Sequence, residues 1–203
     1  MKDNKPISLF IDTATKALCV GAMYNGKKAK SPIMDSKKAL EYTNLAIENL
    51  GKELGFQLKD VDSFYCLLGP GSNTGLRLGL TIPKTIFAFN PKIRLLGIET
   101  LKLFLADKPT SLAALSDRGG NLFLGSIVDG EYSYRKVEKA DIESLPHDRN
   151  IRIEKGDSMA KEELAGFDIE EIDVIDQMME NSASFEDYSD RDDEFLPIYS
   201  QAI

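Results

Sequence analysis

Apolar and polar positions near the start of the chain follow the short spacing of strands. Residues 7–12 and 17–25 predict two strands joined by a turn around Thr15 and Lys16, and Asn25-Gly26 is a dipeptide typical of hairpin turns. A weaker third strand is expected within residues 29–34. The chain is therefore expected to open with three antiparallel strands.

A helical spacing follows. Residues 37–54 predict a helix ended by Gly55, with one face formed by Leu40, Thr43, Ile47, Leu50 and Leu54. A strand at 63–68, a helix at 74–89 that Pro83 should kink, and a strand at 94–98 come next. Three antiparallel strands followed by strand–helix units predict an α/β sandwich.

The second half has a different pattern. Strands at 111–116 and 121–128 are expected to form a hairpin, and Asp129-Gly130 predicts a further turn. We expect two lobes, an N-terminal one over residues 1–100 and a shorter one over residues 101–203.

Composition adds that the 203 residues, 42% of them hydrophobic, can bury one substantial core or two small ones. Cys19 and Cys66 both fall in predicted strands, which favours core positions over a disulfide and suits a reducing compartment. The apolar stretch at residues 7–11 is too short to span a bilayer and lacks the flanks of a signal peptide. A cytoplasmic location without membrane contact is expected.

The charge is unevenly distributed. Residues 154–194 hold 16 acidic and 3 basic side chains, a balance of −13, whereas the rest of the chain carries +5. Such an acidic segment repels nucleic acid, so direct binding of RNA is not expected. Because residues 182–194 are poor in aliphatic side chains, we expect a solvated, partly disordered end, the alternative being an acidic docking site.

One segment carries the most specific signal. Gly69-Pro70-Gly71-Ser72-Asn73-Thr74-Gly75-Leu76-Arg77-Leu78-Gly79 links a predicted buried strand to a predicted helix. The glycines permit a sharp turn and close approach, and Ser72, Asn73 or Thr74 can cap the helix. This glycine-rich turn can hold an anion, or it can be a tight crossover that binds nothing.

The glycine-rich turn resembles the Gly-Pro-Gly-Ser-x-Thr-Gly-x-Arg-x-Gly signature of the bacterial TsaB (YeaZ) family. Ile11-Asp12-Thr13-Ala14-Thr15 likewise resembles the end of that family's first strand. The resemblance covers residues 7 to about 100 and thins beyond them. Departures at Ala39, Asn73 and Pro83 leave open a diverged paralogue without the family's role.

The resemblance implies an α/β fold of the actin-like ATPase type (ASKHA, ribonuclease H-like), with two lobes and a reduced second lobe. In that superfamily the turn after the first strand cradles phosphate with its backbone amides. Here the turn contains Asp12, Thr13 and Thr15 and no glycine, which implies a degenerate nucleotide-binding turn. The alternative is that Asp12 caps this turn through side-chain hydrogen bonds.

Candidate catalytic groups are scarce. His147 is the only histidine, so the paired-histidine metal motif of the related TsaD subunit has no counterpart here. Ser72 has no visible base, as a peptidase of the glycoprotease type would require. We expect no catalytic residue, metal or cofactor. A small-molecule kinase and a peptidase-like protein remain the alternatives.

By resemblance, the chain is a non-catalytic subunit of the complex that installs N6-threonylcarbamoyl on the adenosine next to the tRNA anticodon. The implied partners are a TsaD homologue, which it would bind as a heterodimer and scaffold, TsaE in a larger complex, and a second copy of the chain; tRNA would be contacted only through the complex. The expected interface consists of Tyr42, Leu45, Ala46, Asn49, Leu76 and Leu80, with Gly75 and Gly79 admitting a partner helix. Alternatively, the second lobe covers these faces.

Overall fold

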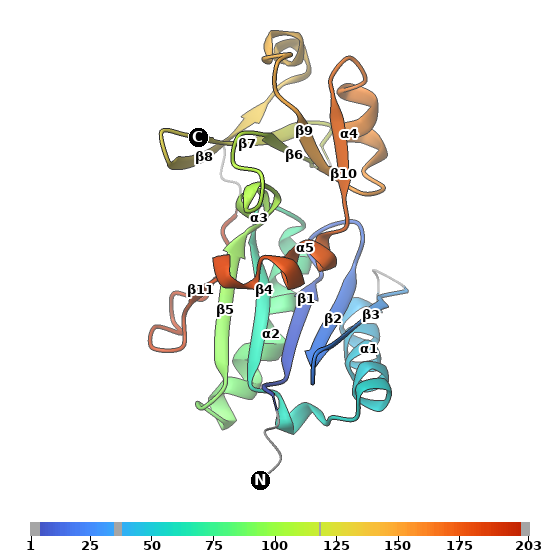
Figure 1. The fold of residues 1–203 in the computed structure, drawn as a ribbon, viewed down its shortest axis with the longest axis vertical. Coiled ribbons are helices and arrows are strands. Elements are labelled where there is room, and N and C mark those ends of the chain that lie inside the picture. Colours follow the sequence, from blue (N-terminus) through green and yellow to red (C-terminus); the bar gives the residue numbers. More distant parts are fainter. Residues whose placement is uncertain (1–4, 35–37, 118, 200–203) are drawn as a thin grey trace.

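The computed structural model describes residues 5–34, 38–117 and 119–199. Two β-sheets lie one above the other along the long axis of the molecule (Figure 1). The first has six strands in the order β11-β5-β4-β1-β2-β3, and the second has five in the order β10-β9-β6-β7-β8. This arrangement of two sheets with helices packed on their faces is the expected α/β architecture.

The first sheet combines two kinds of pairing. The strands β1 (Ser8–Asp12), β2 (Cys19–Tyr24) and β3 (Lys27–Pro32) are antiparallel, whereas β4 (Ser63–Gly69) and β5 (Arg94–Glu99) continue from β1 in parallel. Asn25 and Gly26 both have positive φ, as the predicted hairpin requires. The antiparallel group and the following strand–helix units are therefore confirmed.

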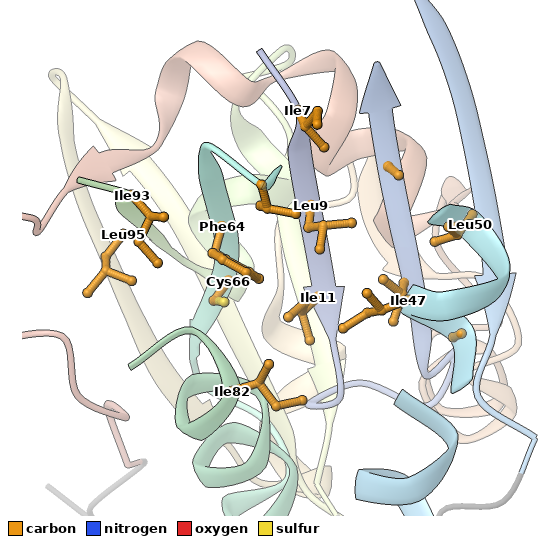
Figure 2. Packing of buried hydrophobic residues seen from close by; sticks show 14 of the residues in the cluster. Ile7, Leu9, Ile11, Ile47, Leu50, Phe64, Cys66, Ile82, Ile93 and Leu95 are labelled. Atoms are coloured by element: carbon orange, nitrogen blue, oxygen red, sulfur yellow. The ribbon is translucent and has the colours of Figure 1, made fainter. Parts of the chain in front are cut away.

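Two helices cover one face of this sheet. They are α1 (Ala39–Leu54), which ends at Gly55 in a left-handed conformation, and α2 (Asn73–Phe89), which continues through Pro83. Figure 2 shows the buried side chains beneath them, with Leu9 and Ile11 of β1 between those of β4 and those of α1. Leu40, expected in this buried stripe, is 49% exposed, because it lies in the first turn of α1 beyond the sheet.

The other face carries α5 (Val174–Glu180), which crosses in front of β4 and β1 in Figure 1. Since side chains alternate along a strand, Phe10 of β1 points to this face while Leu9 and Ile11 point to the first. The short helix α3 (Thr100–Leu105) extends the same apolar cluster to the second sheet. One continuous core thus joins the two sheets.

The second sheet begins with the predicted hairpin. Its strands are β6 (Leu112–Ser116), β7 (Leu122–Val128), β8 (Glu131–Val137), β9 (Ile151–Glu154) and β10 (Ile169–Ile172). The helix α4 (Ser158–Glu163) and the 3-10 turn η3 (Lys139–Ser144) pack on the face away from α3 and enclose a separate small core. Two further 3-10 turns are η2 (Leu58–Asp60) and η4 (Ser182–Ser184).

The acidic C-terminal segment differs from expectation. After β10 the chain returns to the first sheet, where β11 (Glu186–Asp187) pairs with β5. Phe195 is fully buried against the first core, and the Ile198 amide donates to the Leu68 carbonyl at 2.6 Å. The partly disordered end was the wrong expectation, because two aromatic anchors, Phe185 and Phe195, fix a segment whose average composition is polar.

Candidate functional site

A cleft of about 1000 Å³ opens where the turn after β1, the glycine-rich turn and the second sheet meet. The turn after β1 contributes residues 13–16 and the glycine-rich turn contributes residues 71–75. The second sheet contributes Ser116, Phe123 and Glu154. Several of the sequence-predicted residues are therefore brought together at one place.

The turn after β1 is closed by its own side chain. Asp12 is fully buried, and its Oδ1 accepts hydrogen bonds from the amides of Ala14 and Thr15, each at 3.0 Å. Its Oδ2 accepts from the Thr15 hydroxyl. Burial raises the pKa of Asp12, and these hydrogen bonds offset only part of that rise. Asp12 therefore caps the turn after β1, which is the alternative considered for it from the sequence.

The glycine-rich turn is bound directly to the turn after β1. The Ser72 amide donates to the Ala14 carbonyl at 2.8 Å, and the Thr13 hydroxyl donates to the Gly75 carbonyl at 2.7 Å. Ser72 also caps α2 as predicted, its hydroxyl accepting from the Gly75 amide at 3.3 Å. Thr74 lines the cleft without capping the helix.

Close approach explains the glycines of this segment. A Cβ on Gly75 would lie 1.8 Å from the Thr13 carbonyl oxygen, and one on Gly79 would lie 2.6 Å from the Thr13 hydroxyl oxygen. A Cβ on Gly71 would meet the Ala14 carbonyl oxygen at 2.9 Å. The expectation that Gly75 and Gly79 admit a partner helix was wrong, because the chain's own turn occupies that space.

Two other residues of the glycine-rich turn, Gly69 and Arg77, contact the C-terminal segment instead. Gly69 has φ +127°, and a Cβ there would lie 2.2 Å from the Ile198 carbonyl oxygen. The Arg77 Nε donates to the Tyr199 hydroxyl at 2.7 Å, and its guanidinium lies 5.2 Å from that ring's centroid. Neither Gly69 nor Arg77 lines the cleft.

Two acidic residues that follow one another closely at the end of β9, Glu154 and Asp157, contact the turn after β1 from the second sheet. Glu154 Oε1 accepts from the Ala17 amide at 2.5 Å. Lys16 donates to the Ser116 hydroxyl at 2.7 Å and forms an ion pair with Asp157. Asp157 in turn accepts from the Ser116 amide at 2.9 Å, and it caps α4 by accepting from the Ala160 amide at 3.2 Å.

The pKa values of these two carboxyl groups are shifted in opposite directions. Burial, reinforced by the nearby Asp12, raises the pKa of Glu154 to about 7. Burial also acts to raise the pKa of Asp157, but hydrogen bonds from Lys16 and Ser116 outweigh it and hold that pKa below its ordinary value. Beside the turn after β1 there are therefore one carboxyl held ionised, Asp157, and one poised to carry a proton near neutrality, Glu154.

Residues 31–184 match the family described as TsaD, tRNA N6-adenosine threonylcarbamoyltransferase. The chain belongs to this family. No match was found among curated proteins.

Two solved structures share the fold. YeaZ from Pseudomonas aeruginosa has a TM-score of 0.70 and 15% identity, covering 96% of this chain and 100% of that chain. A second structure, of an uncharacterized protein with similarity to peptidase YeaZ from Pseudomonas aeruginosa, has a TM-score of 0.68 and 16% identity, covering 97% of this chain and 100% of that chain. The resemblance to the TsaB (YeaZ) family, and the actin-like fold that it implied, are confirmed.

The expected partner surface of this TsaD-family chain needs correction. Ala46, Leu76 and Leu80 are buried in the chain's own cores, because their helix faces point at the sheet. Tyr42 is partly buried against the first core, whereas Leu45 and Asn49 are exposed on α1.

Sequence reasoning did not identify Lys16, Glu154 and Asp157 as site residues. The available signal was weak: Glu154 ends a strand in which polar and apolar residues alternate although all four are buried. His147, the single histidine, is exposed and stacks on Phe167 with ring centroids 4.3 Å apart. Within the described ranges, no group of three or more His, Cys, Asp or Glu is placed to hold a metal ion, and no helix is long and apolar enough to cross a bilayer.

Proposed function

We propose that this chain is a non-catalytic subunit of the cytoplasmic complex that installs N6-threonylcarbamoyl on the adenosine next to the tRNA anticodon. It would bind and orient a catalytic TsaD homologue, with TsaE joining a larger assembly and tRNA contacted through the complex. Membership of the TsaD family supports the link to this modification.

The observation that carries this proposal is the closed turn after β1. In actin-like kinases that turn binds phosphate through free backbone amides. Here the amides of Ala14 and Thr15 are occupied by Asp12, and the Ala17 amide is occupied by Glu154. A chain with the family fold and a self-occupied phosphate turn is suited to a scaffolding role.

The surface proposed for the partner is centred on Leu45 of α1. This side chain is 45% exposed in the middle of the helix, and Asn49 lies exposed one turn further on. Tyr42 borders Leu45 on the same helix, partly buried, and supplies a rigid aromatic edge. Apolar side chains three residues apart on one helix face, as Tyr42 and Leu45 are, can anchor a helix against an apolar partner surface.

Leu45→Glu tests the proposal. A Glu desolvated inside an apolar interface costs a few kcal/mol, roughly a hundredfold in affinity, whereas the same residue on an exposed helix leaves the fold intact. We expect the variant to lose co-purification with the TsaD homologue from the same genome. It should also fail to restore the modified nucleoside, quantified by mass spectrometry, in cells lacking their own TsaB.

Val128→Glu is the matched control. Val128 is 57% exposed on the second sheet, so the change introduces the same charge far from α1. It should retain partner binding and modification. Equal behaviour of the two folded variants would contradict α1 as the interface, and a wild-type chain that neither binds the homologue nor supports the modification would contradict the proposed function.

A further inference from the structure

The contacts between Glu154 and the turn after β1 leave one atom unexplained. Glu154 is fully buried; its Oε1 accepts from the Ala17 amide, but its Oε2 has no hydrogen-bond partner. An ionised carboxylate oxygen buried without a donor is strongly unfavourable. The site therefore requires a donor to Oε2, or a proton on it.

Thr15 determines which of these is available. Its hydroxyl and the amides of Lys16 and Ala17 lie near the Glu154 carboxyl and offset part of the rise in its pKa. The Thr15 hydroxyl, however, donates its single proton to Asp12 Oδ2. The Thr15 oxygen can still accept a hydrogen bond through its lone pairs. A proton on Glu154 Oε2 would point at this acceptor and satisfy both groups.

We propose that Glu154 carries a proton and donates it to the Thr15 hydroxyl, which donates to the Asp12 carboxylate, so that a proton-dependent clasp joins the second lobe to the turn after β1. The chain of donors runs from β9 through the turn to the end of β1. Losing the proton places two buried carboxylates about one hydroxyl and weakens the clasp. The inference is independent of the proposed function.

The charged groups around Glu154 favour this assignment. Asp12 faces it from the end of β1, and the negative charge of Asp12 raises the pKa of Glu154 further. Lys16, the nearby cation, is already paired with Asp157, and Lys30 of β3 is paired with Asp173 and Asp176. No free cation among the described residues lies against the carboxyl to stabilise its charge.

The sign of the pH effect follows from the pKa of Glu154, raised from 4.5 to about 7. The stabilisation is fully present at pH values below the unfolded pKa and is lost as the pH rises through the folded pKa. Asp157, whose pKa is lowered, acts in a separate window, since its contribution is lost only as the pH falls well into the acid range.

Thermal unfolding of the full chain between pH 6 and pH 8 tests the clasp. In Glu154→Gln the amide oxygen can still accept from Ala17, and the amide nitrogen permanently donates to Thr15. We expect the unfolding temperature of the wild type to fall by about 4 °C relative to that of the variant between pH 6 and pH 8, because the wild type loses roughly one further pKa unit of linked stability over that range. Glu162→Gln, an exposed change on α4, should follow the wild type throughout.

A second measurement reads the proton directly. The wild type should show the infrared C=O stretch of a protonated carboxyl at pH 6, weakened at pH 8 and missing from Glu154→Gln at both. A wild-type pH slope in Glu154→Gln, or a carboxyl stretch that does not depend on Glu154, would overturn the proposal. The infrared signal decides the question even if the variant is destabilised.

Discussion

At the scale of single residues, the glycines of the glycine-rich turn matter because they have no Cβ. Gly71, Gly75 and Gly79 all face the turn after β1 at distances that no side chain allows. The two backbone segments therefore contact each other directly. The glycines of this signature are thus explained by the packing of α2 against the chain's own turn, without an external partner.

Gly75→Ala should destabilise the fold. The added Cβ would lie 1.8 Å from the Thr13 carbonyl oxygen, a backbone atom that cannot move aside cheaply. We expect a loss of about 3 kcal/mol in the free energy of unfolding, despite a gain of about 1 kcal/mol in helix propensity.

Gly166→Ala is its control, since a Cβ there would meet nothing within 4 Å. This change should alter the free energy of unfolding by no more than about 0.5 kcal/mol. Urea denaturation of both variants gives the comparison. Equal stability of the two would mean that α2 does not dock closely on Thr13.

Residues of this kind were only partly predictable. Ser72 could be named as a helix cap because capping depends on neighbours in sequence. The contacts of Lys16 with Asp157 and of Ala17 with Glu154 join positions 141 and 137 residues apart, so no local pattern announces them. In the sequence, an acidic residue that will be buried cannot be distinguished from one that will lie on the surface.

At the scale of elements, the C-terminal segment is the main addition to what the sequence indicated. Its strand β11 covers the edge of β5, with Arg94 Nε donating to Asp187 at 2.8 Å. The strands of the first sheet were predictable because turn dipeptides and apolar runs mark them. A two-residue strand among acidic residues carries no such mark.

Phe195→Ala should weaken the fold through this segment. The ring is fully buried, so its removal leaves a cavity and loses contact with the first core, at a cost of about 3–5 kcal/mol in the free energy of unfolding.

Leu196→Ala provides the comparison, because Leu196 is 53% exposed and next in sequence. It should cost less than about 1 kcal/mol. Chemical denaturation monitored by circular dichroism measures both. If Phe195→Ala proved as mild as its neighbour, residues 195–199 would not be part of the folded core.

At the scale of the whole molecule, the two lobes are joined by buried polar contacts at the cleft and by the continuous apolar cluster around α3. The actin-like architecture was predictable because a specific motif linked the chain to a family. Strand and helix patterns alone predicted only an α/β sandwich. The second lobe gave weaker signals, since β9 and β10 have only four residues each and its site residues are scattered.

Nucleotide affinity follows from this organisation. Phosphate entering the cleft would meet amides already hydrogen-bonded to Asp12 and Glu154, and the ammonium of Lys16 is already paired with Asp157. We expect the isolated chain to bind ATP no tighter than about 1 mM. Isothermal titration calorimetry with magnesium, with an active actin-like kinase as positive control, measures this. Low-micromolar binding would favour the kinase alternative.

The return of the chain to the first sheet has a consequence for synthesis on the ribosome. β5 is complete at residue 99, but its outer edge stays unpaired until residues 186 and 187 emerge and Tyr188 donates to the Leu95 carbonyl at 2.8 Å. An open strand edge is a template for pairing with other chains. The nascent protein thus carries an open edge on β5 throughout the translation of the second sheet, and the pairing of β11 closes it.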